Sequence, residues 1–134
     1  AGRFGGALHP LNAQPSTLID SSLKDIAAAL RDRKVSAVEL ATESLARIDA
    51  GNPKISAFVT TDRDGALAAA RAADERLAAG QGGPLTGIPL AHKDVFCTEG
   101  LLTTCGSKML ANFVSPYDAH VVSLLKKAGA VTVG

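Results

Sequence analysis

The chain has 134 residues, of which 46% are hydrophobic and 20% are charged, a balance typical of a soluble globular protein rather than a disordered one. Its 14 basic and 13 acidic residues give a net charge of +1. Such a balance provides no basic surface for nucleic acid or for an anionic membrane. Any contact of this chain with RNA is therefore expected to need a partner.

The sequence also lacks the patterns of a membrane protein, a secreted protein or a metalloprotein. No apolar run approaches about 18 residues, and the N-terminus has no signal-peptide pattern, so we expect a cytoplasmic protein with no membrane contact. Cys97 and Cys105 match neither a redox motif nor two metal half-sites, and are expected to be free thiols. We assign no metal and no bound cofactor, because the histidines are scattered without a carboxylate cluster (His9, His92 and His120).

Residues 1–17 contain several glycines and prolines without hydrophobic periodicity, so they are interpreted as a mobile leader or an expression remnant. Two helices joined by a tight turn are predicted next. Ser22 begins the first helix, which is expected to stop near Lys34. Ser36 and Glu39 form a Ser-x-x-Glu capping box for the second helix.

A short strand and a third helix are predicted after the second helix ends at Gly51 and Pro53. Residues 55–60 are partly β-branched and are expected to form the strand. Residues 64–79 predict an alanine-rich helix that stops at Gly80. Its inner face has small or apolar residues at helical spacing, which implies close helix packing (Leu67, Ala70, Ala73 and Leu77).

A lysine interrupts the run at residues 87–97, which otherwise predicts a buried β-strand. On a strand, Lys93 and Asp94 point to opposite faces, so the nearest carboxylate is poorly placed to pair with the amine. Burial without a counter-charge lowers the pKa of a lysine from about 10.4 toward neutrality. Lys93 is therefore a candidate base, nucleophile or hydrogen-bond donor. Alternatively, it reaches from an edge strand into solvent or pairs with a distant carboxylate.

The last third of the chain predicts a strand, helix, strand unit. Residues 98–113 have little period and are expected to form an ordered loop with one short helix. Ser115, Pro116 and Asp118 combine three helix-start signals, and Gly129 ends that helix. A strand at 130–133 follows, so we expect a partly parallel sheet with a right-handed crossover. A parallel strand needs neighbours and covering helices, which indicates the front part of a larger α/β domain.

Four separated blocks resemble the amidase signature family: GPLTGIPLAHKD at 83–94, TTCGSK at 103–108, SPYDA at 115–119 and GAV at 129–131. Within it, the chain is most similar to the A subunits of glutamyl-tRNA(Gln)/aspartyl-tRNA(Asn) amidotransferases, over residues 17–134. The resemblance implies an α/β fold, the N-terminal part of an α/β/α sandwich with a mixed sheet that is incomplete in this chain. Residues 18–134 would then be the N-terminal portion of a single amidase domain that continues beyond the chain.

The family uses a Ser, cis-Ser, Lys triad, and the resemblance implies that Lys93 is the catalytic lysine. The two serines belong to a run rich in glycine and serine, and no such run occurs in this sequence. We therefore expect the 134-residue chain by itself to be inactive.

The resemblance also implies a substrate and partners. In such enzymes the A subunit releases ammonia from glutamine through an acyl-enzyme, with backbone amides forming an oxyanion hole. The B subunit uses ATP and Mg²⁺ to activate the misacylated tRNA, converting Glu-tRNA(Gln) or Asp-tRNA(Asn) to Gln-tRNA(Gln) or Asn-tRNA(Asn), and a small C subunit holds the two together. This chain would meet tRNA only through its partner.

Two other functions remain open. The chain is alternatively part of a stand-alone amidase for small amides, or a non-catalytic interaction module derived from the family.

Several residues also have more than one interpretation. Ser21 and Lys24 have the Ser-x-x-Lys spacing of β-lactamase-like enzymes, although helix capping accounts for the serines. A thiol nucleophile would pair a cysteine with His92 or His120, whereas a small buried cysteine is the commoner case. Asp94 is expected to bond loop amides, and a role in holding the site is the alternative. Three hydroxyl residues either line the pocket or stabilise turns (Thr103, Thr104 and Ser107).

Overall fold

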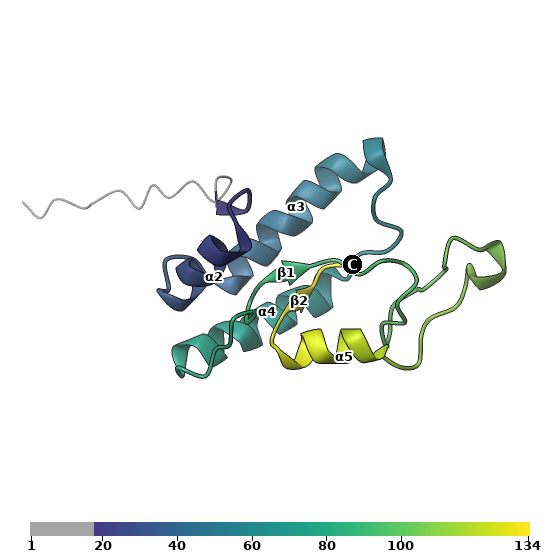
Figure 1. Cartoon of the computed structure of the whole chain (residues 1–134). Coiled ribbons are helices and arrows are strands. Elements are labelled where there is room, and N and C mark those ends of the chain that lie inside the picture. The colour runs from purple at the N-terminus through teal and green to yellow at the C-terminus, as the bar shows by residue number, and fades with distance from the viewer. Residues whose placement is uncertain (1–17) are drawn as a thin grey trace, which may run out of the picture.

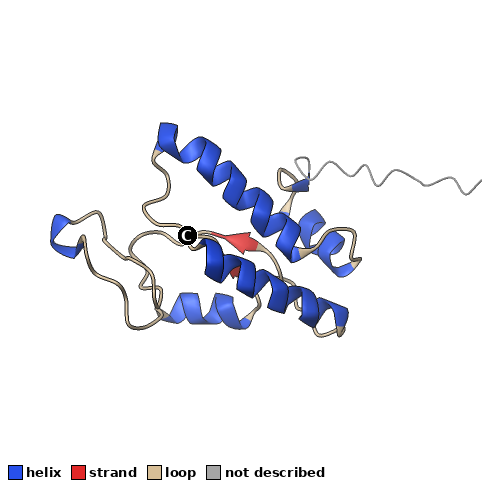
Figure 2. Cartoon of the chain, turned by 180° about the vertical axis from the view of Figure 1, so that it is seen from behind, coloured by secondary structure: helices blue, strands red, loops and turns tan. Residues whose placement is uncertain are grey.

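The computed structural model describes residues 18–134 (Figures 1 and 2). The predicted leader and His9 lie outside the described residues. In chain order, the elements are α2 (Leu23–Arg31), α3 (Ala37–Ile55), α4 (Arg63–Ala78), β1 (Pro89–Leu90), the 3₁₀ helix η1 (Lys108–Leu110), α5 (His120–Lys127) and β2 (Val131–Thr132).

The two strands form a parallel pair, as the strand, helix, strand order predicts. The register places Pro89 opposite Val131 and Leu90 opposite Thr132. Four backbone hydrogen bonds extend this pairing beyond the strands. On the β1 side, the N–H groups of Gly87 and His92 donate to the carbonyls of Gly129 (2.8 Å) and Gly134 (2.9 Å). On the β2 side, the N–H groups of Val131 and Val133 donate to the carbonyls of Ile88 (2.8 Å) and Leu90 (2.9 Å). Since the residues on either side of Pro89 bond to β2, the nitrogen of Pro89 faces away from it.

Helices α2, α3 and α4 share one hydrophobic core with Val131 of β2 and with Ile88 and Val133 beside the strands. Helix α4 lies behind the strands in Figure 1 and in front of them in Figure 2, and it contacts β2, whereas α3 contacts β1 and α4. The largest fully buried apolar side chains come from four of these elements (Leu30, Leu40, Leu45, Val122 and Val131). Of the predicted inner face of α4, Ala70 and Ala73 are buried and Leu67 and Leu77 are partly buried.

The predicted helix starts at Ser22 and Ser36 are confirmed. Ser22 Oγ accepts the Asp25 N–H at 3.2 Å, and Ser36 and Glu39 form the reciprocal capping box. A second carboxylate, Asp74 of α4, accepts two further N–H groups at the start of α3. Helix α2 ends at Arg31, three residues before the predicted stop, because the chain turns into a left-handed conformation shortly after it.

The strand predicted at residues 55–60 is wrong. Helix α3 continues through Gly51 and Pro53 to Ile55 and ends at Ser56, whose φ is +50°. Pro53 lies in the last turn, where a missing N–H costs the helix little. The Asn52 side chain then holds the following loop by accepting the Phe58 N–H (2.8 Å) and donating to the Phe58 carbonyl (2.9 Å).

The strand predicted at 87–97 is much shorter in the structure. It ends at Leu90, and the chain turns at Lys93, whose carbonyl accepts the N–H groups of Val95 (2.6 Å) and Phe96 (2.9 Å). An alternating pattern of faces therefore does not extend to Lys93.

The helix start predicted at Ser115 is wrong, since α5 begins at His120. The hydroxyl of Ser115 donates to the Tyr117 carbonyl at 2.7 Å. Asp118 accepts the Glu99 N–H at 2.8 Å and pairs with Lys126, so this segment closes a loop before the helix begins.

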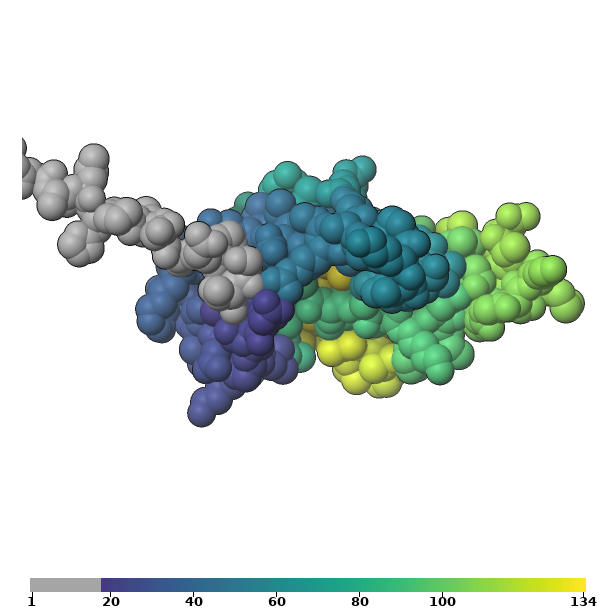
Figure 3. All heavy atoms as spheres, turned by 90° about the horizontal axis from the view of Figure 1, so that it is seen from above, coloured from purple at the N-terminus to yellow at the C-terminus, as the bar shows by residue number. Residues whose placement is uncertain are grey.

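The loop at 98–113 contains one short helix, as predicted, which is η1. An antiparallel bridge between Leu102 and Val114 closes its base. The segment projects from one end of the molecule in Figure 3, and Met109 near its tip is 94% exposed.

Gly87, at the entrance to β1, offers a test of this packing. Its φ is +84°, and a Cβ there would lie 2.8 Å from Cβ of the buried Ala37 at the start of α3. We expect Gly87→Ala to lower the free energy of unfolding by about 2 to 5 kcal/mol, through backbone strain and overpacking together. Urea unfolding of the chain measures this loss.

The matched control is Gly100→Ala, because Gly100 has a φ of +81° with nothing within 4 Å of the added Cβ. It is expected to lose only the backbone component, about 1 to 2 kcal/mol. Equal losses in the two variants would contradict the close approach of β1 to α3.

Candidate active site

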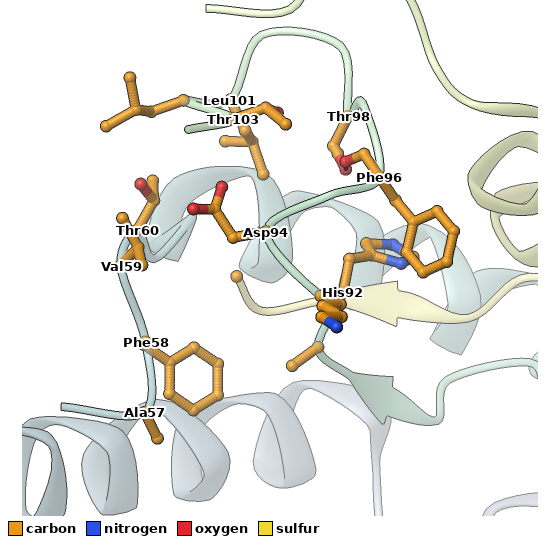
Figure 4. Close-up of a pocket in the computed structure, with 14 residues that line it drawn as sticks. Ala57, Phe58, Val59, Thr60, His92, Asp94, Phe96, Thr98, Leu101 and Thr103 are labelled. Carbon is orange, nitrogen blue, oxygen red and sulfur yellow. Dashed lines mark hydrogen bonds between the residues drawn. The ribbon is translucent and has the colours of Figure 1, made fainter. Parts of the chain in front are cut away.

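A pocket of about 400 Å³ lies at the carboxyl end of the parallel strands (Figure 4). Three loop segments line it, from residues 57–60, 91–98 and 101–103, together with Gly134 just after β2. Open parallel sheets bind ligands beyond the carboxyl ends of their strands, where the loops leave the sheet. The pairing of β1 with β2 therefore places residues some forty positions apart around one hollow.

Lys93 lines this pocket, but it is exposed rather than desolvated. The prediction of a buried lysine is wrong, because β1 ends three residues earlier. Asp94 lines the same pocket, and the strand on which the two side chains were expected to face opposite sides ends before either residue. The flexible Lys93 side chain is instead in contact with water at the edge of the pocket that it lines.

The Asp94 carboxylate is hydrogen-bonded to the projecting loop (residues 98–113), as predicted. It accepts the Thr104 N–H at 2.7 Å and the Thr104 hydroxyl, and the Asp94 carbonyl accepts the Cys105 N–H at 2.8 Å. Partial burial raises the pKa of Asp94, but the hydrogen bonds from Thr104, Gly106 and Cys105 outweigh it and hold this pKa below its usual range. The carboxylate is therefore charged at neutral pH.

His92 is also among the residues that line the pocket. Its ring Nε2 lies 3.1 Å from the hydroxyl of Thr132 in β2. Burial lowers the pKa of His92, as does the positive charge of Lys126, and Asp118 opposes the effect only partly. The ring is accordingly neutral at pH 7, and its contact with Thr132 holds it against the strand.

Thr60 is a polar group of the pocket that sequence analysis missed. Its Oγ1 is buried and has no hydrogen-bond partner among the described residues. In Figure 4 the Asp94 carboxylate points toward the side on which Thr60 lies, and the ring of Phe58 enters from the same segment. No local pattern marks Thr60, since it reaches the pocket only because the loop after α3 packs against β2, where Asp62 N–H donates to the Val133 carbonyl.

The remaining candidates are divided between the pocket and structural positions. Thr103 is buried and lines the pocket, whereas Ser107 caps η1 by accepting the Met109 N–H at 3.2 Å. Ser22 caps α2 next to Ser21, and Lys24 is exposed on the first turn of that helix.

Both cysteines are free, as predicted, but neither is fully buried, since Cys97 is half-buried and Cys105 exposed. The Cys97 thiol donates to the Tyr117 hydroxyl at 3.6 Å, and His120 is exposed at the start of α5.

Metal ligands and membrane-spanning helices are both missing from residues 18–134. No cluster of three or more histidine, cysteine, aspartate or glutamate side chains in that range is able to hold a metal ion. None of the helices described there is both long enough and apolar enough to cross a bilayer.

The arrangement supplies an amine, a fixed carboxylate and several hydroxyl groups at one hollow with aromatic walls. These groups suit the binding of a small polar molecule such as an amide. An amine beside it can move protons, which is what amide cleavage requires.

Sequence comparison finds close relatives over most of the chain. The chain is 72% identical over 117 residues to the A subunit of the glutamyl-tRNA(Gln) amidotransferase of Aromatoleum aromaticum, and 69% identical to the A subunit of the same name from an Azoarcus species. Each alignment covers 87% of this chain and 24% of the relative. The chain thus spans about a quarter of the length of these relatives.

Solved structures show the same fold. The peptide amidase of Stenotrophomonas maltophilia superposes with a TM-score of 0.80 at 32% identity, over 86% of this chain and 24% of the amidase. An amidase family protein of Bacillus anthracis superposes with a TM-score of 0.81 at 23% identity, over 92% of this chain and 25% of that protein. The predicted α/β fold, part of an amidase-signature fold, is confirmed.

The amidase family model matches residues 39–134, which include β1, Lys93, the projecting loop, α5 and β2. The resemblance of the sequence blocks to this family is thereby confirmed. The match extends over more than half of the chain, and the chain therefore belongs to the amidase family.

Proposed function

We propose that this chain is the N-terminal portion of the glutamine-hydrolysing subunit of a tRNA-dependent amidotransferase, with Lys93 as its catalytic lysine. The observation that supports this most directly is the position of Lys93 just beyond β1, in a pocket at the carboxyl end of the parallel pair. The 72% identity to a relative of that name supports the choice among amidases.

In the proposed reaction a serine oxygen attacks the side-chain carbonyl carbon of glutamine. Its proton passes through a bridging serine to the Lys93 amine, which returns a proton to the departing nitrogen. The C–N bond breaks, ammonia leaves, and water then releases glutamate from the acyl-enzyme. Both serines would come from outside the 134 residues, since no run rich in glycine and serine occurs in this sequence.

The exposed position of Lys93 limits what this segment contributes alone. A lysine open to water exchanges protons with solvent, whereas catalysis needs the reacting groups held together and water controlled. We propose that the pocket is closed by the rest of the protein, and that Lys93 gains its catalytic surroundings there. The segment described here supplies one side of the site.

The proposed partners follow from the same assignment. Ammonia would pass to a B subunit that uses ATP and Mg²⁺ to convert Glu-tRNA(Gln) to Gln-tRNA(Gln), or Asp-tRNA(Asn) to Asn-tRNA(Asn), and a small C subunit would complete a cytoplasmic heterotrimer. The net charge of +1 suits a chain that leaves tRNA contact to its partner.

A stand-alone amidase for small amides is the second candidate, favoured by the structural likeness to the peptide amidase. The two functions differ in whether the complete protein needs partner subunits. Formation of Gln-tRNA(Gln) from glutamine, ATP and Glu-tRNA(Gln) by the complete protein with B and C subunits tests the first. Hydrolysis of small amides by the complete protein alone, without that transfer, would favour the second.

The purified 134-residue chain is expected to release no ammonia from glutamine, because it lacks the nucleophile. A coupled glutamate dehydrogenase assay measures this, with the complete protein as the positive control. Hydrolysis by the purified chain above the enzyme-free blank would contradict the need for the missing serines.

Lys93→Ala in the complete protein is expected to lower glutamine hydrolysis by at least about 100-fold, because the substitution removes the proton-transfer group. The complete protein is expected to keep its fold, and its thermal midpoint checks this. Lys108→Ala is the matched control: Lys108 is an exposed lysine of η1. Near-normal turnover in Lys93→Ala would show that Lys93 is not catalytic.

A further inference from the structure

We infer that Asp94 is a positioning residue for Lys93, acting through its hydrogen bonds to the loop at 104–106. This inference rests on the proposed function, because it assigns Asp94 a role in the reaction that Lys93 performs. It starts from an asymmetry at the site: the Lys93 side chain is exposed, yet the backbone around it is held on both sides.

On the N-terminal side, the parallel pairing fixes the backbone. His92 N–H donates to the Gly134 carbonyl at 2.9 Å, and the His92 ring contacts Thr132. On the C-terminal side, the Lys93 carbonyl accepts two N–H groups of the turn that follows. The direction of the Lys93 Cα–Cβ bond is thus set by its neighbours rather than by packing of its own side chain.

The Asp94 clamp, defined as the hydrogen bonds between Asp94 and residues 104–106, fixes that turn. The carboxylate accepts both the N–H (2.7 Å) and the hydroxyl of Thr104, and the Asp94 carbonyl accepts the Cys105 N–H (2.8 Å). The Thr104 hydroxyl in turn accepts the Gly106 N–H at 3.1 Å. Hydrogen bonds to an ionised acceptor are stronger than neutral ones, so this clamp is well suited to hold a turn.

The loop has a shape that requires such an anchor. Cys105 and Gly106 both have left-handed backbones, with φ of +52° and +67°. The three successive N–H groups of this turn each have an acceptor within the clamp: the Asp94 carboxylate, the Asp94 carbonyl and the Thr104 hydroxyl. The Asp94 clamp therefore joins the residue next to Lys93 to this left-handed turn, through the carboxylate to Thr104 and through the backbone carbonyl to Cys105.

A purely structural role for Asp94 predicts lost stability with normal turnover. A positioning role predicts lost turnover, since small displacements of a reacting group cost about 100-fold. Asp118 provides the comparison, because it also holds a loop, accepting the Glu99 N–H (2.8 Å) and the Lys126 ammonium (2.7 Å). Asp118 is not among the residues that line the pocket.

The test uses the complete protein, with kcat and KM for glutamine hydrolysis and the thermal midpoint measured for each variant. Asp94→Ala is expected to lower kcat by about 10- to 100-fold with little change in KM. Asp118→Ala is expected to lower the thermal midpoint while kcat stays near its normal value.

Thr104 gives a second approach that keeps the carboxylate. Thr104→Val, which removes the hydroxyl at nearly constant volume, is expected to lower kcat as Asp94→Ala does, and Thr104→Ser is expected to restore it. The double variant Asp94→Ala with Thr104→Val is expected to lose less than the sum of the single losses, since both remove one clamp. If Asp94→Ala fails to fold, Thr104→Val and Thr104→Ser still test the positioning role.

The outcomes separate the two proposals. Normal kcat in Asp94→Ala or in Thr104→Val, with Lys93→Ala inactive, overturns the positioning role and leaves the proposed function intact. Equal losses of kcat in Asp94→Ala and Asp118→Ala also overturn it, because the effect is then general destabilisation. An active Lys93→Ala overturns the proposed function itself.

Discussion

The parallel pairing of β1 with β2 is the constraint on which the site depends. Each strand has only two residues, yet four flanking hydrogen bonds align the chain from Gly87 to His92 with the chain from Gly129 to Gly134. Closing a loop of about forty residues costs entropy, although that cost grows only slowly with length. The burial of Val131 and Ile88 against the helices offsets the cost, because each removes a large apolar side chain from water.

The position of the pocket follows from where this pairing ends. Lys93 and Asp94 leave the sheet where Gly134 does, and the loop after α3 joins them through the bond from Asp62 to Val133. Backbone hydrogen bonds thus fix several of the turns that line the pocket, whereas the Lys93 side chain is exposed. A fixed backbone with an exposed amine is an arrangement that lets a second part of a protein complete the site.

Sequence patterns predicted the local features of the fold well. Ser22, Ser36 and Glu39 each bond a group within four residues along the chain, so their capping bonds follow from spacing alone. The parallel pairing was also predictable, because a strand, helix, strand order permits few arrangements.

Several errors concern residues whose side chains bond distant groups. Asp94 bonds Thr104, Asn52 bonds Phe58 and Asp118 bonds Lys126, and each of these contacts replaces a regular element that periodicity predicted. The exposure of Lys93 is one result: an apolar run predicts a long strand, but the strand ends at Leu90 and the chain turns at Lys93, whose carbonyl accepts the Val95 and Phe96 N–H groups. Neither the partner nor the turn is visible in a pattern of hydrophobicity.

The orientation of Pro89 has a consequence for how the sheet can grow. Its ring nitrogen faces the outer edge of β1, where an ordinary residue would offer an N–H. A strand arriving on that side finds the carbonyl of Pro89 as an acceptor but meets its first donor only at Ala91. Indiscriminate edge-to-edge association of exposed strands is weakened there, and the edge favours a neighbour whose register tolerates the missing donor.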